Sequence, residues 1–162
     1  MKNSLTALTL LLACCAMTTT LCAATAEATA NVTEYDWPAY ANDPGSSKYA
    51  DLDQINKDTV RNLQTAWVWG SPDNALAQSE GGFTPAGFKS TPIKIGNTLY
   101  ISTSLGHVVA IDAVTGEQKW VFDTETYKSG RPANMGFNHR GVAFWQADGK
   151  RRILMGTNNA YL

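Results

Sequence analysis

Three basic side chains in the second half of the chain have the chemistry of a site that binds anions. Arg140 and His139 stand together in the stretch NHRGVAFW (138–145), and Lys89 precedes a strand-like run. An arginine offers a planar fork that matches a carboxylate, whereas a lysine offers a compact point charge. On physical grounds alone, Arg140 also fits a surface ion pair and Lys89 a solvated lysine at a strand edge. In an extended stretch His139 points to the face opposite Arg140, which suits packing as well as binding.

The elements that must position these residues are short strands. Runs of β-branched and aromatic residues bounded by turn residues occur at 65–69, 91–95, 98–103, 107–112, 118–122, 141–146 and 152–157. Gly-Asn at 96–97, Thr-Gly at 115–116 and Asp-Gly at 148–149 are favourable hairpin turns between them. These features predict an all-β fold.

Two stretches before the strands have a different character. Asp58 can cap a short helix that runs through Leu63. The stretch 70–88 is rich in glycine, proline and serine and reads as one long loop. No long amphipathic helix is expected anywhere in the mature chain.

A weak internal repeat indicates how the strands are organised. The segment LYISTSLGHV (99–108) aligns with ILMGTNNAYL (153–162) at an offset of 54 residues, and Thr103 meets Thr157. A period of this length matches four short strands, the blade of a β-propeller. A chance likeness of two hairpins is the alternative.

The stretch AIDAVTGEQKW, from Ala110 to Trp120, is interpreted as structural. Asp112 and the Thr-Gly pair at 115–116 turn the chain, and a large aromatic residue closes the motif. A tryptophan in this position can dock on the turn of a neighbouring blade, where its buried area contributes about 2–3 kcal/mol.

The first 26 residues have the pattern of a secretory signal peptide. Lys2 precedes an apolar stretch over 5–17, and Ala-Thr-Ala at 24–26 is the best cleavage site. The stretch Leu11–Cys14 loosely resembles a lipoprotein cleavage box, which is the alternative. The three cysteines all lie in this region, so the mature chain must rely on a buried core and not on disulfides.

The charge balance excludes one class of partner. The formal net charge is −1, with 13 basic and 14 acidic residues. Such a near-neutral chain gives no reason to expect nucleic acid as a partner.

Several segments resemble the exported bacterial dehydrogenases that use pyrroloquinoline quinone (PQQ). The pattern A-x-D-x-x-T-G-x-x-x-W at 110–120 is similar to the tryptophan-docking motif of that family. The stretches 36–69 and 90–103 resemble its N-terminal region, and GRPANMGFNHRGVAFW (130–145) resembles the stretch that brings an arginine to the quinone. The resemblance covers 36–162 and is nearest to the glucose and sugar dehydrogenase branch. It implies an eight-bladed β-propeller, of which this chain would supply about the first two blades.

The resemblance also implies which residues meet the cofactor. PQQ is a planar tricarboxylate o-quinone, and Arg140 aligns with the quinone-binding arginine of the family. Lys89 and His139 are further candidates, although Lys89 stands where many relatives have a glutamate. No adjacent cysteines precede Arg140, which disfavours the alcohol and methanol branch. No catalytic or metal-binding residue is assigned to this chain, since the catalytic aspartate and the Ca²⁺ ligands are expected in later blades.

The implied function is oxidation of a sugar or an alcohol, with electrons passing to PQQ and then to a quinone or a cytochrome. The expected organisation is a signal peptide (1–26), an N-terminal segment with a short helix (27–64) and a partial propeller (65–162). The protein is expected in the periplasm, with peripheral membrane association as a further expectation, and this chain alone is not expected to be active. The alternative is a non-enzymatic propeller scaffold of the outer-membrane assembly type, which binds no quinone. A carbohydrate-binding propeller is a third reading, disfavoured because no aromatic platform is evident.

Overall fold

The structure, a computed structural model, describes residues 36–79, 82–133 and 135–162. The signal peptide predicted over 1–26 and the beginning of the N-terminal segment lie outside the described residues. In the part of the chain that is described, no helix is long and apolar enough to cross a membrane.

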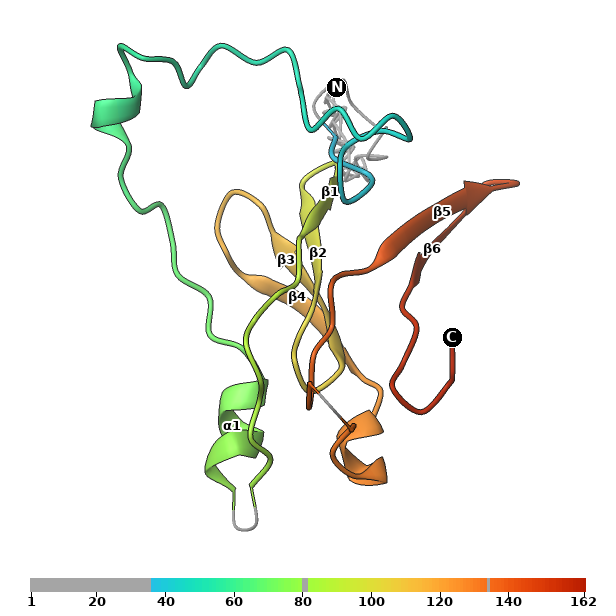
Figure 1. The fold of residues 1–162 in the computed structure, drawn as a ribbon. Coiled ribbons are helices and arrows are strands. Elements are labelled where there is room, and N and C mark those ends of the chain that lie inside the picture. The colour runs from blue at the N-terminus through green and yellow to red at the C-terminus, as the bar shows by residue number, and fades with distance from the viewer. Residues whose placement is uncertain (1–35, 80–81, 134) are drawn as a thin grey trace, which may run out of the picture.

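The centre of the molecule is a four-stranded antiparallel sheet whose strands follow one another in chain order (Figure 1). Its strands are β1 (Ile93–Ile95), β2 (Thr98–Ser102), β3 (His107–Asp112) and β4 (Gln118–Asp123). Gly96 in the β1–β2 turn and Gly116 in the β3–β4 turn have φ of 55° and 74°, which glycine adopts without steric cost. The predicted turns therefore form, and the four strands have the arrangement of one propeller blade.

A second hairpin extends to one side of this sheet (Figure 1). It consists of β5 (Ala143–Ala147) and β6 (Lys150–Leu154). Asp148 and Gly149 join the strands with φ of 51° and 70°, the pair of positive values that a tight Asp-Gly hairpin turn requires. The strands expected over 141–146 and 152–157 are thus found, with β6 beginning earlier than expected.

The backbone confirms the repeat at an offset of 54 residues. After β2, the Thr103 N–H donates to the His107 carbonyl at 2.9 Å, and Thr103 Oγ1 accepts from the His107 N–H at 3.0 Å. After β6, the Thr157 N–H donates to the Tyr161 carbonyl at 2.8 Å, and Thr157 Oγ1 accepts from the Tyr161 N–H at 2.9 Å. The same threonine-centred turn therefore follows the second strand of both hairpins.

The helical segments are short and differ in part from the prediction. The helix expected over 58–63 is a single 3-10 turn, η1 (Val60–Asn62). The structure adds α1 (Asp73–Gln78) within the expected loop 70–88, and η2 (Thr126–Ser129) after β4. The buried Asp73 ties α1 to the central sheet, and this tertiary contact outweighs a local composition that favours loop.

The prediction of a strand over 65–69 is wrong. This segment pairs with no strand in the described residues, although its alternating tryptophans suggest one. Instead Trp67 and Trp69 pack their rings against a buried cluster formed by Ile101, Val109 and Ile111 of the sheet. The aromatic residues act through side-chain packing and not through a backbone ladder.

Trp67, and not Trp120, lies against the turn of the motif at 110–120. Its indole N–H donates to the Ala113 carbonyl at 3.4 Å, and a Cβ added at Gly116 would lie 2.4 Å from Trp67 Cδ2. Trp120 is 41% exposed, and its ring centroid lies 5.9 Å from that of Tyr100. The predicted docking of Trp120 on a turn is therefore not found among the described residues. Trp67, about one repeat earlier, fills that role.

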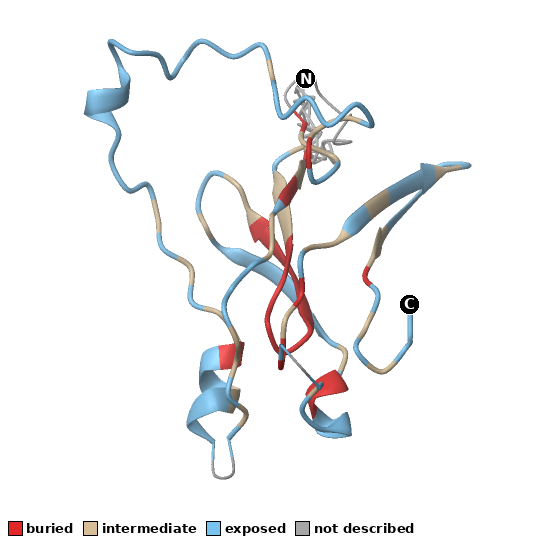
Figure 2. Ribbon diagram, viewed as in Figure 1, coloured by how far each residue is buried: buried red, intermediate tan, exposed pale blue. Residues whose placement is uncertain are grey.

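Burial is concentrated in β3 and in the turn that precedes it, while β4 is exposed along its length (Figure 2). A second buried cluster consists of Leu105, Tyr127 and Phe137, with Leu76 and Phe83 packed against it. This cluster joins α1, η2 and the segment before β5. It therefore anchors the two loops that lead to Lys89 and to Arg140.

Candidate functional site

Lys89 and Arg140 line the same cavity, although they are 51 positions apart in the chain. The Thr91 N–H donates to the Arg140 carbonyl at 3.1 Å, and a parallel bridge joins Thr91 to Gly141. A Cβ added at Gly141, whose φ is 145°, would lie 3.1 Å from the Thr91 carbonyl oxygen, so glycine permits this close approach. The cavity has a volume of about 610 Å³, within the range of ligand sites.

The cavity combines cations with an apolar wall. Its lining residues are Tyr40, Lys89, Thr91, Arg140, Gly141, Val142, Ala143, Leu154, Met155 and Gly156. No carboxylate is among them, and among the described residues neither the Lys89 nor the Arg140 side chain forms an ion pair. Both side chains are exposed, so each can contact an anion that enters the cavity.

His139 does not reach this cavity. Its side chain is buried, and its Nε2 has no hydrogen-bond partner in the described part of the chain. This nitrogen lies 3.4 Å from the position that a Cβ at Gly106 would occupy. Burial lowers the pKa of His139, and the nearby Asp73 opposes this effect only in part. The imidazole packs by the turn at Gly106, and the structure brings together only Lys89 and Arg140 of the three candidates.

Tyr40 was not a candidate from the sequence, yet it also lines the cavity. It arrives there because Trp37 and Lys94 exchange two backbone hydrogen bonds of 2.9 Å, which lay the N-terminal segment beside β1. The pairing joins residues 57 positions apart, so no local sequence pattern predicts it. The only signal in the sequence is that Tyr40 belongs to the stretch 36–69 that resembles the N-terminal region of the dehydrogenases.

Sequence patterns did not predict a buried polar cluster either. Asp73 Oδ1 lies 2.9 Å from Nδ1 of His107, and Asp73 Oδ2 accepts the Leu105 N–H at 3.0 Å. On the other edge of the imidazole, Nε2 lies 3.7 Å from Oδ1 of Asp123, whose Oδ2 accepts the Tyr127 hydroxyl at 2.9 Å. Burial alone would raise the pKa of Asp73, but hydrogen bonds from His107, Thr103 and Leu105 outweigh burial and lower it.

This cluster connects the two loops that carry the basic residues to the cavity. Asp73 belongs to α1, which precedes Lys89, while Asp123 and Tyr127 precede Arg140. The Ala86 N–H also donates to the Phe137 carbonyl at 3.2 Å, a direct link between the same loops. The cluster therefore serves a structural purpose, the alignment of the segments around 86–91 and 137–141.

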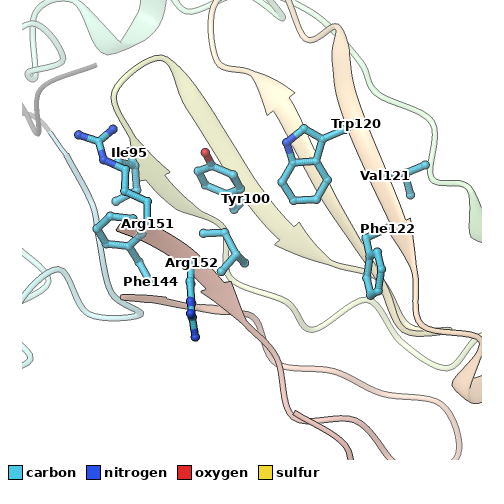
Figure 3. A pocket seen from close by; sticks show the side chains of 9 residues that line it. Ile95, Tyr100, Trp120, Val121, Phe122, Phe144, Arg151 and Arg152 are labelled. Atoms are coloured by element: carbon cyan, nitrogen blue, oxygen red, sulfur yellow. The ribbon is translucent and has the colours of Figure 1, made fainter. Parts of the chain in front are cut away.

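A second cavity, of about 470 Å³, lies between the central sheet and the second hairpin (Figure 3). Tyr100, Trp120 and Phe122 line it from the sheet, and Phe144 and Arg151 line it from the hairpin. Its lining is mainly apolar, includes the two arginines Arg151 and Arg152, and contains none of the three candidate residues.

Similarity to a known protein family identifies the family of this chain. The family model for the PQQ glucose/ethanol/alcohol dehydrogenase β-propeller domain matches residues 37–162. The chain belongs to this family. The predicted PQQ-type β-propeller fold is thereby confirmed.

Characterised members of the PQQ dehydrogenase family are similar along most of this chain. The quinoprotein glucose dehydrogenase of Escherichia coli K12 is 35% identical over an alignment of 151 residues that covers 85% of this chain and 18% of that protein. Quinoprotein glucose dehydrogenase A of Acinetobacter calcoaceticus is 36% identical over an alignment of 127 residues that covers 76% of this chain and 15% of that protein. The chain thus spans less than a fifth of the length of these relatives.

A solved structure agrees with this assignment. The quinohemoprotein alcohol dehydrogenase of Comamonas testosteroni superimposes with a TM-score of 0.58 at 30% identity, over 80% of this chain and 17% of that protein. The match includes an alcohol dehydrogenase as well as glucose dehydrogenases, so the family membership does not select one substrate.

Proposed function

We propose that this chain forms the N-terminal part of an exported PQQ-dependent dehydrogenase that oxidises a sugar or an alcohol. Family membership supports the reaction class, and two quinoprotein glucose dehydrogenases at 35% and 36% identity favour a sugar. The observation that carries the proposal is the single cavity that contains both Lys89 and Arg140 and no carboxylate.

The cavity fits the acidic cofactor. Arg140 can hold a carboxylate of PQQ through two parallel hydrogen bonds, and Lys89 can neutralise another as a point charge. Leu154 and Met155 provide the apolar wall that a planar ring system needs. Bound PQQ supplies the o-quinone that takes up the hydride from the C–OH group of the substrate. The role of this chain in the reaction is to bind and orient the quinone.

Calcium does not fit the described residues. Ca²⁺ takes six to eight oxygen ligands, mostly carboxylates and carbonyls. In the described ranges, no group of three or more His, Cys, Asp or Glu residues could hold a metal ion. We therefore assign no step to calcium here, and the proposal places its ligands and the catalytic base in other parts of the full-length dehydrogenase.

Export and electron transfer complete the proposal. The signal-peptide pattern over 1–26 supports a periplasmic protein that passes electrons to a quinone or a cytochrome, at or near the membrane surface. Protein isolated from the periplasmic fraction is expected to begin at Glu27. Recovery of chains that retain Met1 in the cytoplasm would contradict export.

Reconstitution tests the proposed reaction. Full-length apo-protein, supplied with PQQ and Ca²⁺, is assayed against a panel of sugars and alcohols with a dye as electron acceptor. We expect PQQ-dependent oxidation of at least one of them, and a higher PQQ requirement for Arg140→Ala than for the matched surface variant Arg61→Ala. Absence of PQQ-dependent activity with every compound would instead favour the scaffold reading.

A further inference from the structure

We propose that Tyr40, with Lys48 behind it, forms an aromatic and cationic wall that contacts the ring system of the bound quinone. This inference rests on the proposed function, because it assigns a role toward PQQ to the N-terminal segment. Neither the family relationship nor the sequence motifs give that segment a role in binding.

Tyr40 is held at the cavity by a well-tethered turn. Besides the Trp37–Lys94 backbone pair, the buried Asp36 carboxylate accepts the Gly96 N–H at 2.8 Å. The Trp37 indole N–H donates to the Tyr40 carbonyl at 3.4 Å. The backbone that carries Tyr40 is therefore fixed against β1, the strand that follows Lys89.

The side chain of Tyr40 remains available for a ligand. It is 64% exposed although it lines the cavity, and its hydroxyl forms no hydrogen bond among the described residues. The Lys48 ammonium lies over the ring, 5.6 Å from its centroid. One face of the ring thus carries a cation, which leaves the other face for the ligand.

This arrangement suits a planar polyanion in particular. An aromatic ring can stack on a planar ligand, whereas it adds little binding energy for a flexible aliphatic acid, which has no ring to stack on. The ammonium on the far face adds a third positive charge beside those of Lys89 and Arg140. Tyr40, Lys89 and Arg140 come from separate segments of the chain and line the same cavity.

Calorimetric titration of the full-length apo-protein tests the proposal with two ligands, PQQ and citrate. Citrate carries three carboxylates and no ring, so it reports on the cations alone. We expect Tyr40→Leu to weaken PQQ binding by about three- to tenfold and to leave citrate binding unchanged. Tyr40→Phe should bind PQQ within about twofold of the wild type, because the ring remains.

Tyr49→Leu is the matched control, since Tyr49 is also 64% exposed in the same segment but does not line the cavity. It should leave both affinities unchanged, and thermal melting should show that all variants are folded. If Arg140→Ala weakens PQQ binding but Tyr40→Leu does not, the role of Tyr40 is wrong and the proposed function stands. If the wild type binds no PQQ, the proposed function fails and this inference with it.

Discussion

The carboxylate of Asp73 and the imidazole of His107 lie 2.9 Å apart, and both residues are buried, with 4% and 5% of their surface exposed. They join α1 to the first residue of β3 across 34 positions of the chain. The contact thereby fixes the loop that leads from the tryptophans at 67 and 69 to the cation at 89.

Removal of this carboxylate should destabilise the fold strongly. Asp73→Ala leaves the buried His107 and the Leu105 N–H without their acceptor, and a buried donor left unsatisfied costs about 1–3 kcal/mol. Equilibrium unfolding in urea measures the change, with Asp53→Ala as an exposed control. Equal free energies of unfolding for the two variants would show that the pair has no structural role.

The glycine against Trp67 provides a test of the docking contact. Gly116→Ala should destabilise the fold for two reasons: its φ is 74°, and the new Cβ would clash with the Trp67 ring. Gly149→Ala is the matched control, because its φ is 70° but nothing lies within 4 Å of the new Cβ. It should cost only about 1 kcal/mol, the price of the backbone conformation.

The same contact predicts a coupling between two substitutions. Trp67→Ala removes a half-buried indole and should cost about 1–3 kcal/mol by itself. In the double variant with Gly116→Ala the clash disappears, so the two effects should sum to more than the measured change. Full additivity in thermal or urea unfolding would mean that Trp67 does not press on this turn.

The turn at Asp112 should loosen in acid. Hydrogen bonds from the Thr115 N–H, the Lys119 ammonium and the Val114 N–H lower the pKa of Asp112 from 3.8 to about 2. Because the folded state depresses this pKa, the ionised carboxylate stabilises the fold above 3.8, and the contribution is lost as the pH falls through 2.

Unfolding of the wild type and of Asp112→Asn across this range measures the effect. The difference in stability should shrink as the pH falls from 3.8 to 2. The exposed Asp53→Asn should show no such convergence. A constant difference for Asp112→Asn would contradict the assigned pKa.

Local sequence patterns correctly predicted the hairpin turns and the strand β3, because these features depend on residues close together in the chain. The Gly-Asn, Thr-Gly and Asp-Gly pairs each mark a hairpin turn in the structure, and the run 107–112 coincides with β3. The pattern at 65–69 failed because alternating aromatic residues suit packing on a sheet as well as membership of one. The helix at 73–78 was missed because a long-range contact, that of Asp73 with His107, determines its conformation.

The geometry of the candidate site also depends on contacts between distant parts of the chain, which local patterns do not predict. Residue chemistry and the family resemblance selected Lys89 and Arg140, but their shared cavity depends on the backbone pairing of Thr91 with Gly141. Tyr40 enters through the pairing of Trp37 with Lys94. Both pairings join distant parts of the chain, so neither could be deduced from the composition or the periodicity of one segment.

We propose that Lys89 and Arg140 together bind the carboxylates of PQQ, and the dissociation constant for PQQ measures their contribution. Arg140→Ala in the full-length apo-protein should weaken binding by about ten- to a hundredfold, the range for a hydrogen bond to a charged group. Arg140→Lys should restore part of the affinity, since it keeps the charge and loses the fork. Lys89→Ala should weaken binding too, while Arg61→Ala and Lys57→Ala, both exposed elsewhere, should not. Dissociation constants equal to that of the wild type in both Arg140→Ala and Lys89→Ala would contradict the account.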